Sequence, residues 1–413
     1  MSKSNNSLNA PFETVGTNFN KFYDTISDNN SNDRSGFYFF IALLIVAFIV
    51  FLVISWIFYT LNKKGAACTK LSTIYKNIWH HHSVSFLTSN GNVKPEAKEI
   101  NNPNNFFDDV NKSLIKNYYI KTAYNACCGD GYKNNFVNMC ALEKCIQLGA
   151  RCLDFEIYSY NGEPVVAAST ANNNSIKETY NYIKLTDILN YLNNNSFDTS
   201  KTSCGNDPMF LHFRIMSENK IIYDKFGDYI DTILTKNNLA DIIKYNYKNP
   251  DLNNLLQGHI ASLDFNKKFI IMVNTLHGTI LDTSKLAKYV HIRSGTNSLR
   301  LLRYEKLVAS GKNNSMLIDE SHRSLIMVLP NIDNTLDNFD PLLAFNNGCQ
   351  FVGMKFQNLD SKLQGYYKMF KDTGGFAFVL KSNNLRRDII PPETPTPDTG
   401  PLRVGGGASL TSV

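Results

Sequence analysis

One uninterrupted apolar stretch constrains this chain more than any other feature. From Phe37 to Leu61 the sequence reads FYFFIALLIVAFIVFLVISWIFYTL and contains no charged residue. A helix rises about 1.5 Å per residue, so roughly 20 such residues cross the hydrocarbon core of a bilayer, which is about 30 Å thick. Tyr38, Trp56 and Tyr59 lie near the ends of the stretch, where aromatic rings favour the membrane interface. The stretch predicts a single-pass transmembrane helix over residues 37–61, with a helix buried in a protein core as the alternative.

The residues that flank this stretch indicate its type and its orientation. A polar segment, residues 1–36, precedes it, which does not fit a secretory signal peptide. Positive charges are more frequent just after the stretch than just before it, where only Lys21 and Arg34 are close. Those that follow are Lys63, Lys64, Lys70 and Lys76. Since positively charged flanks favour the cytosolic side, we expect the C-terminal bulk there and residues 1–36 across the membrane.

The rest of the chain has the composition of a folded protein. Of the 413 residues, 43% are hydrophobic, and the formal net charge is +6. A full core is therefore available, and no strong field of either sign is expected. The sequence has no dense run of Lys and Arg of the kind that tracks a nucleic-acid backbone. We expect no nucleic-acid partner.

Composition also divides the chain into regions. The N-terminal region is rich in Ser and Asn, and the residues from Pro391 onward are rich in Pro and then Gly, so both ends are expected to be flexible. The run His80 to His82 lacks nearby carboxylates and cysteines, and we interpret it as a solvated stretch rather than a metal site. The expected regions are a polar tail (1–36), a transmembrane helix (37–61), a linker or small subdomain (62–112), a folded domain (113–387) and a disordered tail (388–413).

Cysteines are concentrated in one part of the folded region, at Cys127, Cys128, Cys140, Cys145 and Cys152. An oxidising compartment would favour disulfides among them, whereas the cytosol would keep them as buried thiols. They contain no CxxC pair, so a zinc site is not expected. The cytosolic orientation favours reduced thiols.

Strand and helix patterns alternate across residues 113–387. Alternating apolar and polar residues predict strands in ARCLDFEIYSY and PMFLHFRIMS, and apolar runs predict others in FIIMVN, GCQFVGMKFQ and GGFAFVLK. Helical patterns such as NMCALEKCIQLG and YDKFGDYIDTILTK lie between them. The alternation predicts a parallel sheet covered by helices, and about 275 residues is the size of an α/β barrel.

Two long segments then resemble a known enzyme family. ALEKCIQLGARCLDFEIYSYNGEPVV is similar to the X region, and NNGCQFVGMKFQNLDSKLQGYYKMFKDTGGFAFVLKSNNLR to the Y region, of eukaryotic phosphoinositide-specific phospholipase C. The resemblance implies a TIM-type barrel of the phospholipase C-like phosphodiesterase kind, with its pocket at the C-terminal ends of the strands. It also leads us to expect that the strand at residues 349–357 lies next to the strand at residues 376–381.

Carried over residue by residue, the resemblance implies that the catalytic histidines are replaced. The family uses two histidines as base and acid and a calcium ion to offset phosphate charge. Tyr124 stands at the position of the first histidine, followed by a retained Asn125, and Ala168 stands at the position of the second. Alanine cannot transfer a proton, and a tyrosine with a pKa of about 10 is a poor base near neutrality.

The resemblance also implies a changed metal site. Two calcium ligands are retained as Asp154 and Glu156, with the acid types exchanged, but Arg214 stands at the position of a third acidic ligand. Two carboxylates on one strand face repel each other, and a guanidinium from a neighbouring strand can engage both. We expect Arg214 to replace the calcium ion and no cofactor to be required; the alternative is that Arg214 faces solvent.

The positions that would bind the substrate differ as well. The family's phosphate-binding lysines fall near Asn274 and Leu276, and its inositol-binding Arg and Tyr fall on Met327 and Leu329. We therefore interpret the chain as a membrane-anchored phospholipase C-like pseudoenzyme that works in binding, scaffolding or membrane structure, with the bilayer and a phospholipid or protein at the barrel mouth as partners. The alternative is an active phosphoric diester hydrolase with non-standard catalytic residues, among His212, His259, His277 and His291.

Overall fold

The computed structural model describes residues 34–77, 82–90, 92, 94, 114–171, 176–234, 238–249 and 265–386. The chain divides into two compact units, Met1–Lys70 and Leu71–Val413. Most of the expected N-terminal tail, the whole expected C-terminal tail, His80, His81 and His259 lie outside the described residues.

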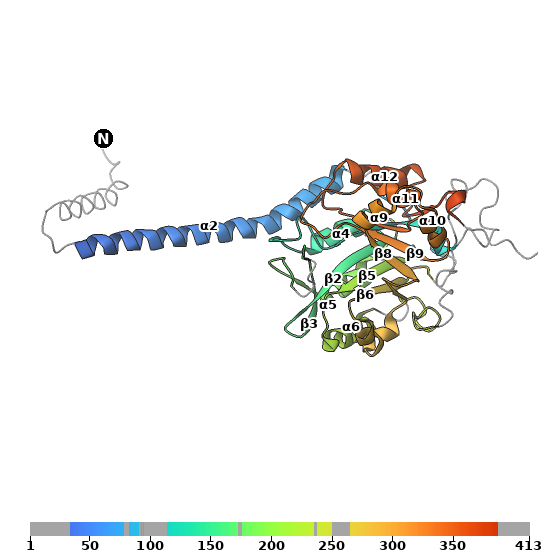
Figure 1. Cartoon of the computed structure of the whole chain (residues 1–413), viewed down its shortest axis with the longest axis horizontal. Coiled ribbons are helices and arrows are strands. Elements are labelled where there is room, and N and C mark those ends of the chain that lie inside the picture. Colours follow the sequence, from blue (N-terminus) through green and yellow to red (C-terminus); the bar gives the residue numbers. More distant parts are fainter. Residues whose placement is uncertain are drawn as a thin grey trace, which may run out of the picture. The chain divides into compact units, whose positions relative to one another are not determined.

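The apolar stretch forms a continuous helix, α2 (Arg34–Asn77) (Figure 1). Residues Gly36–Asn77 are long and apolar enough to cross a membrane, and the most apolar part of the helix is not buried against protein. A helix satisfies its backbone hydrogen bonds internally, which is the condition for placing so many exposed apolar side chains in lipid. The helix continues beyond Leu61 into the region expected as a linker, because Lys, Ala and Leu residues there favour helix.

The described part of unit Leu71–Val413 is built on eight parallel strands that form a nearly closed barrel. Neighbouring strands follow the order β7-β6-β5-β2-β1-β10-β9-β8, and a parallel bridge between Ser294 and Leu299 joins the two ends. The strands are β1 (Tyr118–Ala123), β2 (Cys152–Tyr160), β5 (Met209–Ile215), β6 (Phe269–Thr275), β7 (Ile292–Arg293), β8 (Leu299–Arg303), β9 (Leu325–Leu329) and β10 (Phe351–Met354). The expected TIM-type barrel is confirmed.

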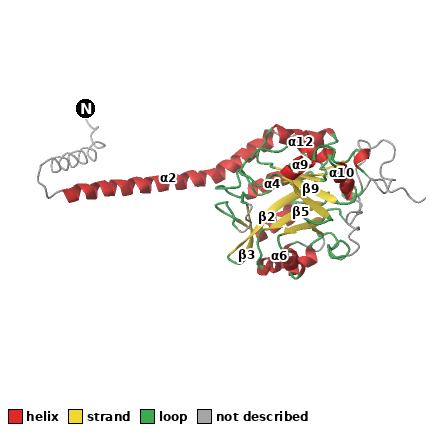
Figure 2. Cartoon of the chain, viewed as in Figure 1, coloured by secondary structure: helices red, strands yellow, loops and turns green. Residues whose placement is uncertain are grey.

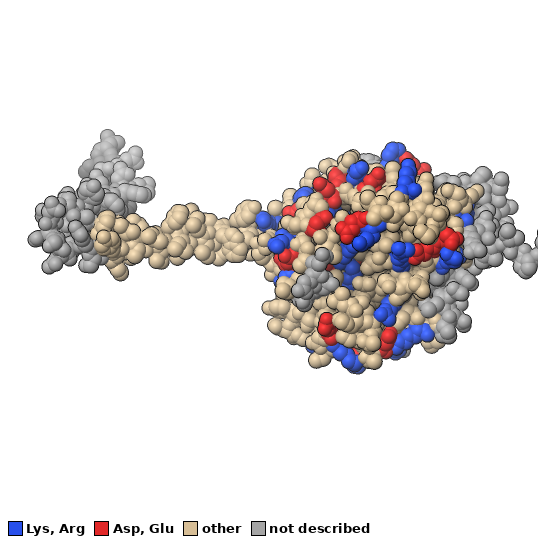
Figure 3. All heavy atoms as spheres, viewed as in Figure 1, with Lys and Arg blue, Asp and Glu red and all other residues tan. Residues whose placement is uncertain are grey.

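Helices connect and surround these strands, as Figure 2 shows. Each buries one apolar face; α4, for example, buries Ala141, Leu142, Cys145 and Ile146. They are α4 (Met139–Gln147), α5 (Leu185–Asn195), α6 (Lys220–Ile233), α8 (Gly278–Asp282), η5 (Lys285–Tyr289), α9 (Tyr304–Ser310), α10 (Ser315–Ser321), α11 (Pro341–Asn346) and α12 (Ser361–Asp372). On the face drawn in Figure 3, Lys and Arg side chains are interspersed with Asp and Glu.

Three further strands extend the sheet, and one of them corrects an expectation. β3 (Glu163–Ala167) pairs with β2 and with β4 (Ile183–Lys184). β11 (Phe378–Leu380) pairs antiparallel with the first half of β1, whereas β10 pairs parallel with β1. The prediction that the strands at residues 349–357 and 376–381 are neighbours was therefore wrong. β10 and β11 each pair with β1 and not with each other, and α12 lies between them along the chain.

Residues 82–90, here called the N-terminal strap, cross the end of the barrel at which the strands begin. The backbone N–H groups of Phe86 and Leu87 donate to the two carboxylate oxygens of Asp207, at 2.9 and 2.8 Å, and Asp207 lies two residues before the start of β5. Asn266, which precedes β6, donates to the carbonyl of Thr88. Since Phe86 and Leu87 are fully buried, the strap belongs to the barrel core.

The cysteine cluster is mostly reduced. Cys127, Cys128, Cys145 and Cys152 are buried free thiols, and burial raises the pKa of Cys145 to about 12. Cys140 is disulfide-bonded, so the expectation of reduced thiols was wrong for this residue. Cys140 lies on a half-buried face of α4, unlike the others, which point into the core.

Candidate site at the barrel mouth

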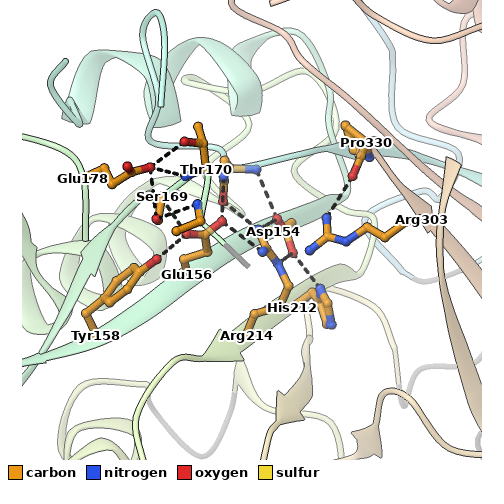
Figure 4. A network of polar contacts seen from close by, with 12 residues as sticks. Asp154, Glu156, Tyr158, Ser169, Thr170, Glu178, His212, Arg214, Arg303 and Pro330 are labelled. Atoms are coloured by element: carbon orange, nitrogen blue, oxygen red, sulfur yellow. Dashed lines mark hydrogen bonds and ion pairs between the residues drawn. The ribbon is translucent and has the colours of Figure 1, made fainter. Parts of the chain in front are cut away.

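Two acidic residues and two basic residues face each other across adjacent strands. Along β2, Asp154 and Glu156 alternate onto one face. In the parallel pairing of β2 with β5, Asp154 lies opposite His212 and Glu156 lies opposite Arg214. These residues cluster toward the C-terminal ends of the strands, the end of such a barrel at which active sites lie (Figure 4).

Arg214 engages both carboxylates, as expected from the sequence. Its Nε donates to Oδ1 of Asp154 at 2.9 Å and its Nη2 to Oδ2 at 2.7 Å, a two-bond contact that matches the planar fork of arginine. Its Nη1 donates to Oε1 of Glu156 at 2.9 Å. Arg214 is only 2% exposed and Asp154 is fully buried, so the alternative of a solvent-facing Arg214 does not hold.

Asn125 completes the contacts of the guanidinium. It follows β1 with a φ of 43°, a left-handed conformation that asparagine adopts more readily than most residues. Its side-chain oxygen accepts from Nη2 of Arg214 at 2.8 Å, and its Nδ2 donates to Oε1 of Glu156 at 3.0 Å. Its backbone N–H donates to Oδ2 of Asp154 at 3.2 Å. One asparagine thus ties all three charged side chains together.

Glu156 has two more donors on its other oxygen. The hydroxyl of Tyr158 and the backbone N–H of Ser169 donate to Oε2 at 2.7 and 3.0 Å. Ser169 and Thr170 in turn donate to Glu178, which also pairs with Lys133 at 3.0 Å. Every carboxylate oxygen of Asp154 and Glu156 therefore accepts at least one hydrogen bond within the protein.

The charges of this cluster determine its protonation. Burial opposes ionisation of Asp154, but the charge of Arg214 and the hydrogen bonds from His212 and Arg214 outweigh it and hold the pKa of the carboxyl well below its usual value. Burial also opposes the charge of Arg214, and the two carboxylates reverse this effect and raise its pKa. The charge of Arg214 is thus sufficient to keep Asp154 ionised in spite of its burial.

His212 extends the network away from Arg214. Its Nδ1 lies 2.7 Å from Oδ1 of Asp154, and its Nε2 lies 2.8 Å from the hydroxyl oxygen of Ser294, which directly follows β7. His212 is fully buried, and burial lowers its pKa although the hydrogen bond to Asp154 opposes the shift. The sequence indicated that His212 and Arg214 share a strand face, and the structure brings both to Asp154.

Comparison with known proteins agrees with this architecture. Residues 268–384 match the family described as the phosphatidylinositol-specific phospholipase C Y domain. A stretch of 99 residues is 30% identical to phosphoinositide phospholipase C 7 of Arabidopsis thaliana and covers 23% of this chain and 17% of that protein. The crystal structures of PLC21 from L. pealei and from S. officinalis each superimpose with a TM-score of 0.54 over 68% of this chain and 39% of theirs, at 17% and 16% identity.

The barrel has the phospholipase C fold. This finding confirms the resemblance noted in the two sequence segments, and the matched region spans the second half of the barrel, from β6 to β11. The chain spans less than half the length of these relatives.

Tyr124 and Ala168 occupy the two positions that align with the family's catalytic histidines. Neither side chain can serve as a base near neutral pH. Tyr124 is 3% exposed, and its ring lies 5.0 Å from Cζ of Arg214. Burial raises the pKa of Tyr124, so its hydroxyl stays protonated and is no base near neutrality. Ala168 follows β3 and is fully buried, and its methyl group can neither donate nor accept a proton.

Calcium does not fit this phospholipase C-like site. The oxygens that would bind the ion are occupied by N–H and O–H donors, and the guanidinium of Arg214 lies between the two carboxylates. A second cation at this position would be repelled by the charge of Arg214. Among the described residues, no group of three or more His, Cys, Asp or Glu side chains is placed to hold a metal ion.

The remaining candidate residues differ in their distance from the mouth. Asn274 donates to the carbonyl of Ser294 at 3.2 Å and so borders the site. His277 is exposed and pairs with Glu218 at 2.8 Å. His291 is buried and accepts from the backbone N–H of Ile271, which is a structural role.

The two positions aligned with the inositol-binding residues are part of the core. Met327 and Leu329 are fully buried in β9, so neither offers a hydrogen bond to a sugar ring. Leu276, near a position of the family's phosphate-binding lysines, is exposed and uncharged. The structure does not bring a ring-binding or phosphate-binding group to any of these positions.

Three residues of the site were not expected from the sequence. Tyr158 continues the alternation of Asp154 and Glu156 along β2, and that pattern could have identified it. Ser294 gave no signal, because β7 has only two residues and no alternation to read. Arg303 ends β8, is half-buried, and donates to the carbonyl of Pro330 at 2.9 Å; Figure 4 shows it reaching toward Asp154 and His212.

Proposed function

We propose that this chain is a membrane-anchored phospholipase C-like protein that does not cleave phosphoinositides and acts by binding or scaffolding through its barrel. The observation that carries the proposal is the contact of Arg214 with Asp154 and Glu156. A permanent internal cation replaces the exchangeable metal ion that the family's chemistry needs.

Cleavage of a phosphodiester requires a base, an acid and a positive charge near the phosphate. Tyr124 and Ala168 supply neither base nor acid. The charge of Arg214 is already offset by two carboxylates, so it is not available to a phosphate group. These three changes together remove proton transfer and charge stabilisation, while the strands that hold the barrel are kept.

The proposal places α2 in the bilayer as the anchor and makes membrane lipid the first partner. The length and the exposed apolar surface of α2 support this role. The mouth is then free to hold a phospholipid headgroup or a protein segment by contacts other than metal coordination. The lysine bias after the apolar stretch supports a cytosolic barrel.

The test uses the purified full chain in vesicles that contain phosphatidylinositol or its bisphosphate, with and without calcium. We expect no release of inositol phosphates and no calcium-dependent change in melting temperature at millimolar calcium. The variant Arg214→Glu places three carboxylates together, so it should melt at a lower temperature without calcium and regain stability when calcium is added.

A matched control is Arg300→Glu, which changes an arginine on the exposed side of β8 that pairs with Glu320. Its melting temperature should not depend on calcium. Calcium stabilisation of the unmodified chain, or lipid turnover that is lost in Asp154→Asn, would contradict the proposal. Turnover lost in His212→Gln would favour an active phosphodiesterase with non-standard residues.

A further inference from the structure

Asp154, His212 and Ser294 form a hydrogen-bonded chain at the mouth that the lost phosphodiester chemistry does not use. The chain runs from Oδ1 of Asp154 to Nδ1 of His212 at 2.7 Å, and from Nε2 to the hydroxyl of Ser294 at 2.8 Å. Asp154 and His212 lie in β2 and β5, and Ser294 directly follows β7 and bridges to Leu299; the three residues are 0%, 0% and 3% exposed. Their position is set by strands and not by mobile loops.

The tautomer of His212 follows from its partners. The carboxylate of Asp154 is ionised, because Arg214 contributes two hydrogen bonds to it, and an ionised carboxylate can only accept. Nδ1 of His212 therefore carries the proton. Nε2 of the neutral ring then has a free lone pair, and the hydroxyl of Ser294 is the donor in the second contact. This is the arrangement in which a histidine can take a proton from a serine.

We propose that Ser294 is an activated nucleophile toward small carboxylic esters, with His212 as its base and Asp154 as the residue that positions His212. The Ser294 oxygen bonds to the ester carbonyl carbon while its proton moves to Nε2 of His212. The bond from that carbon to the alcohol oxygen then breaks, and the alcohol leaves with the proton from His212. Water then adds to the acyl carbon while its proton moves to Nε2 of His212, the bond from that carbon to the Ser294 oxygen breaks, and the Ser294 oxygen takes the proton back from His212 as the acid leaves.

The charges at the mouth favour a carboxylic ester over a phosphodiester. Asp154 and Glu156 already offset the charge of Arg214, and the nearby Asn274 is neutral, so neither Arg214 nor Asn274 attracts an anionic phosphate. Arg303 ends the next strand along the chain from Ser294, and Figure 4 shows it reaching toward His212, so we assign it the role of offsetting charge that develops on the ester oxygen. Since Ser294 is nearly buried, the ester must be small and uncharged.

This inference goes beyond the proposed function and is separable from it, because Ser294 can react in a barrel that does not cleave phosphoinositides.

The experiment incubates the full chain in detergent with a small, uncharged fluorophosphonate. The oxygen of a reactive serine displaces fluoride from the phosphorus of this reagent. Peptide mapping by mass spectrometry should locate the adduct at Ser294. The labelling rate should fall about 100-fold or more in Ser294→Ala and in His212→Gln.

Ser284→Ala is the matched control, because Ser284 is also buried but donates to the carbonyl of Leu281 and contacts no histidine in the described structure. Its labelling should equal that of the unmodified chain. No adduct at Ser294 in the folded, unmodified chain would overturn the inference, and this result does not depend on whether any variant folds. An adduct whose rate of formation is unchanged in His212→Gln would overturn the role of His212.

Discussion

Arg214 reaches both carboxylates of β2 because β5 is the parallel neighbour of that strand, with Glu156 directly opposite Arg214. Two buried acidic side chains share the one guanidinium at this point, and Asn125, Tyr158 and His212 contribute further hydrogen bonds to them. Such a cluster is costly to desolvate, and its members depend on one another. At the scale of single residues, the site should therefore be much more sensitive to the loss of one member than the surface is.

Removal of the guanidinium alone tests this dependence. Arg214→Met leaves two buried carboxylates without a counter-charge, and we expect a loss of about 3–5 kcal/mol in the free energy of unfolding, measured by chemical denaturation. Arg300→Met removes a partly exposed ion pair with Glu320 and should cost less than about 1 kcal/mol. Equal effects of the two substitutions would contradict a buried, interdependent cluster.

A buried histidine should make the stability depend on pH. His291 accepts from the backbone N–H of Ile271 at 3.0 Å, which requires an unprotonated Nδ1, and burial lowers its pKa from 6.5 to about 4. Between those values the unfolded chain binds a proton that the folded chain does not. The free energy of unfolding should therefore fall as the pH falls from 6.5 to 4, by up to about 3 kcal/mol from this residue.

The measurement is a series of denaturation curves across that pH range. His291→Gln should show a shallower dependence than the unmodified chain, with the remainder coming from other groups such as His212, whose pKa burial also lowers. His277→Gln changes an exposed histidine and should leave the slope unaltered. A slope unchanged in His291→Gln would be inconsistent with the assigned protonation state.

At the scale of elements, the tight turn before β2 determines how the N-terminal strap packs against the barrel. Gly149 lies between α4 and β2 with a φ of +83°, and a Cβ added there would come within 2.6 Å of Cβ of Ser83. Ser83 belongs to the N-terminal strap, so this turn has room for the strap only with glycine. The turn and the strap are thus coupled, although they are far apart in the sequence.

Substitutions at Gly162 and Gly149 distinguish the energetic cost of a left-handed backbone at a non-glycine residue from the cost of the steric clash with Ser83. Gly162, in the turn between β2 and β3, has a similar φ of +71° but nothing within 4 Å of an added Cβ. Gly162→Ala should cost about 1–2 kcal/mol from the conformation alone. Gly149→Ala should cost more, because Ser83 must also move; similar unfolding free energies for both variants would show that the strap does not pack there.

Asp207 fastens the strap to the barrel through two backbone N–H groups. Asp207→Ala leaves the buried amides of Phe86 and Leu87 without acceptors, which should cost about 2–4 kcal/mol and increase hydrogen exchange at these two amides. Asp198→Ala, in the same connection, removes a half-exposed carboxylate that bonds to the nearby Ser200 and pairs with Lys201, and it should leave exchange in the strap unchanged. Unaltered protection of Phe86 and Leu87 in Asp207→Ala would rule out this anchoring role.

At the scale of the whole molecule, the chain combines an apolar helix long enough to cross a membrane with a barrel of the phospholipase C fold. Neither feature specifies the side of the membrane on which the barrel lies. The lysines after the apolar stretch favour the cytosolic side, whereas the disulfide at Cys140 is of a kind more frequent in oxidising compartments. The orientation therefore needs a direct measurement.

Protease added to sealed vesicles that carry the chain provides that measurement. With the expected orientation, residues 1–36 should be trimmed and the barrel should remain intact, as seen with antibodies to each end of the chain. Vesicles opened with detergent serve as the control, in which the exposed connections of the barrel also become accessible. Cleavage within the barrel in sealed vesicles, or a glycan at Asn313, would place the barrel on the other side.

The sequence alone determined the features that depend on neighbouring residues along the chain. The apolar run specified α2, and the alternation in β2 placed Asp154 and Glu156 on one face, because side-chain direction in a strand follows a period of two. The resemblance of motifs then predicted the barrel fold and a contact of Arg214 with the two carboxylates. Only the tertiary structure decided which distant strands became neighbours: β11 against β1, Ser294 beside His212, and the strap against Asp207. Such pairings depend on how the barrel closes, and closure is a property of all its strands together, which no local pattern contains.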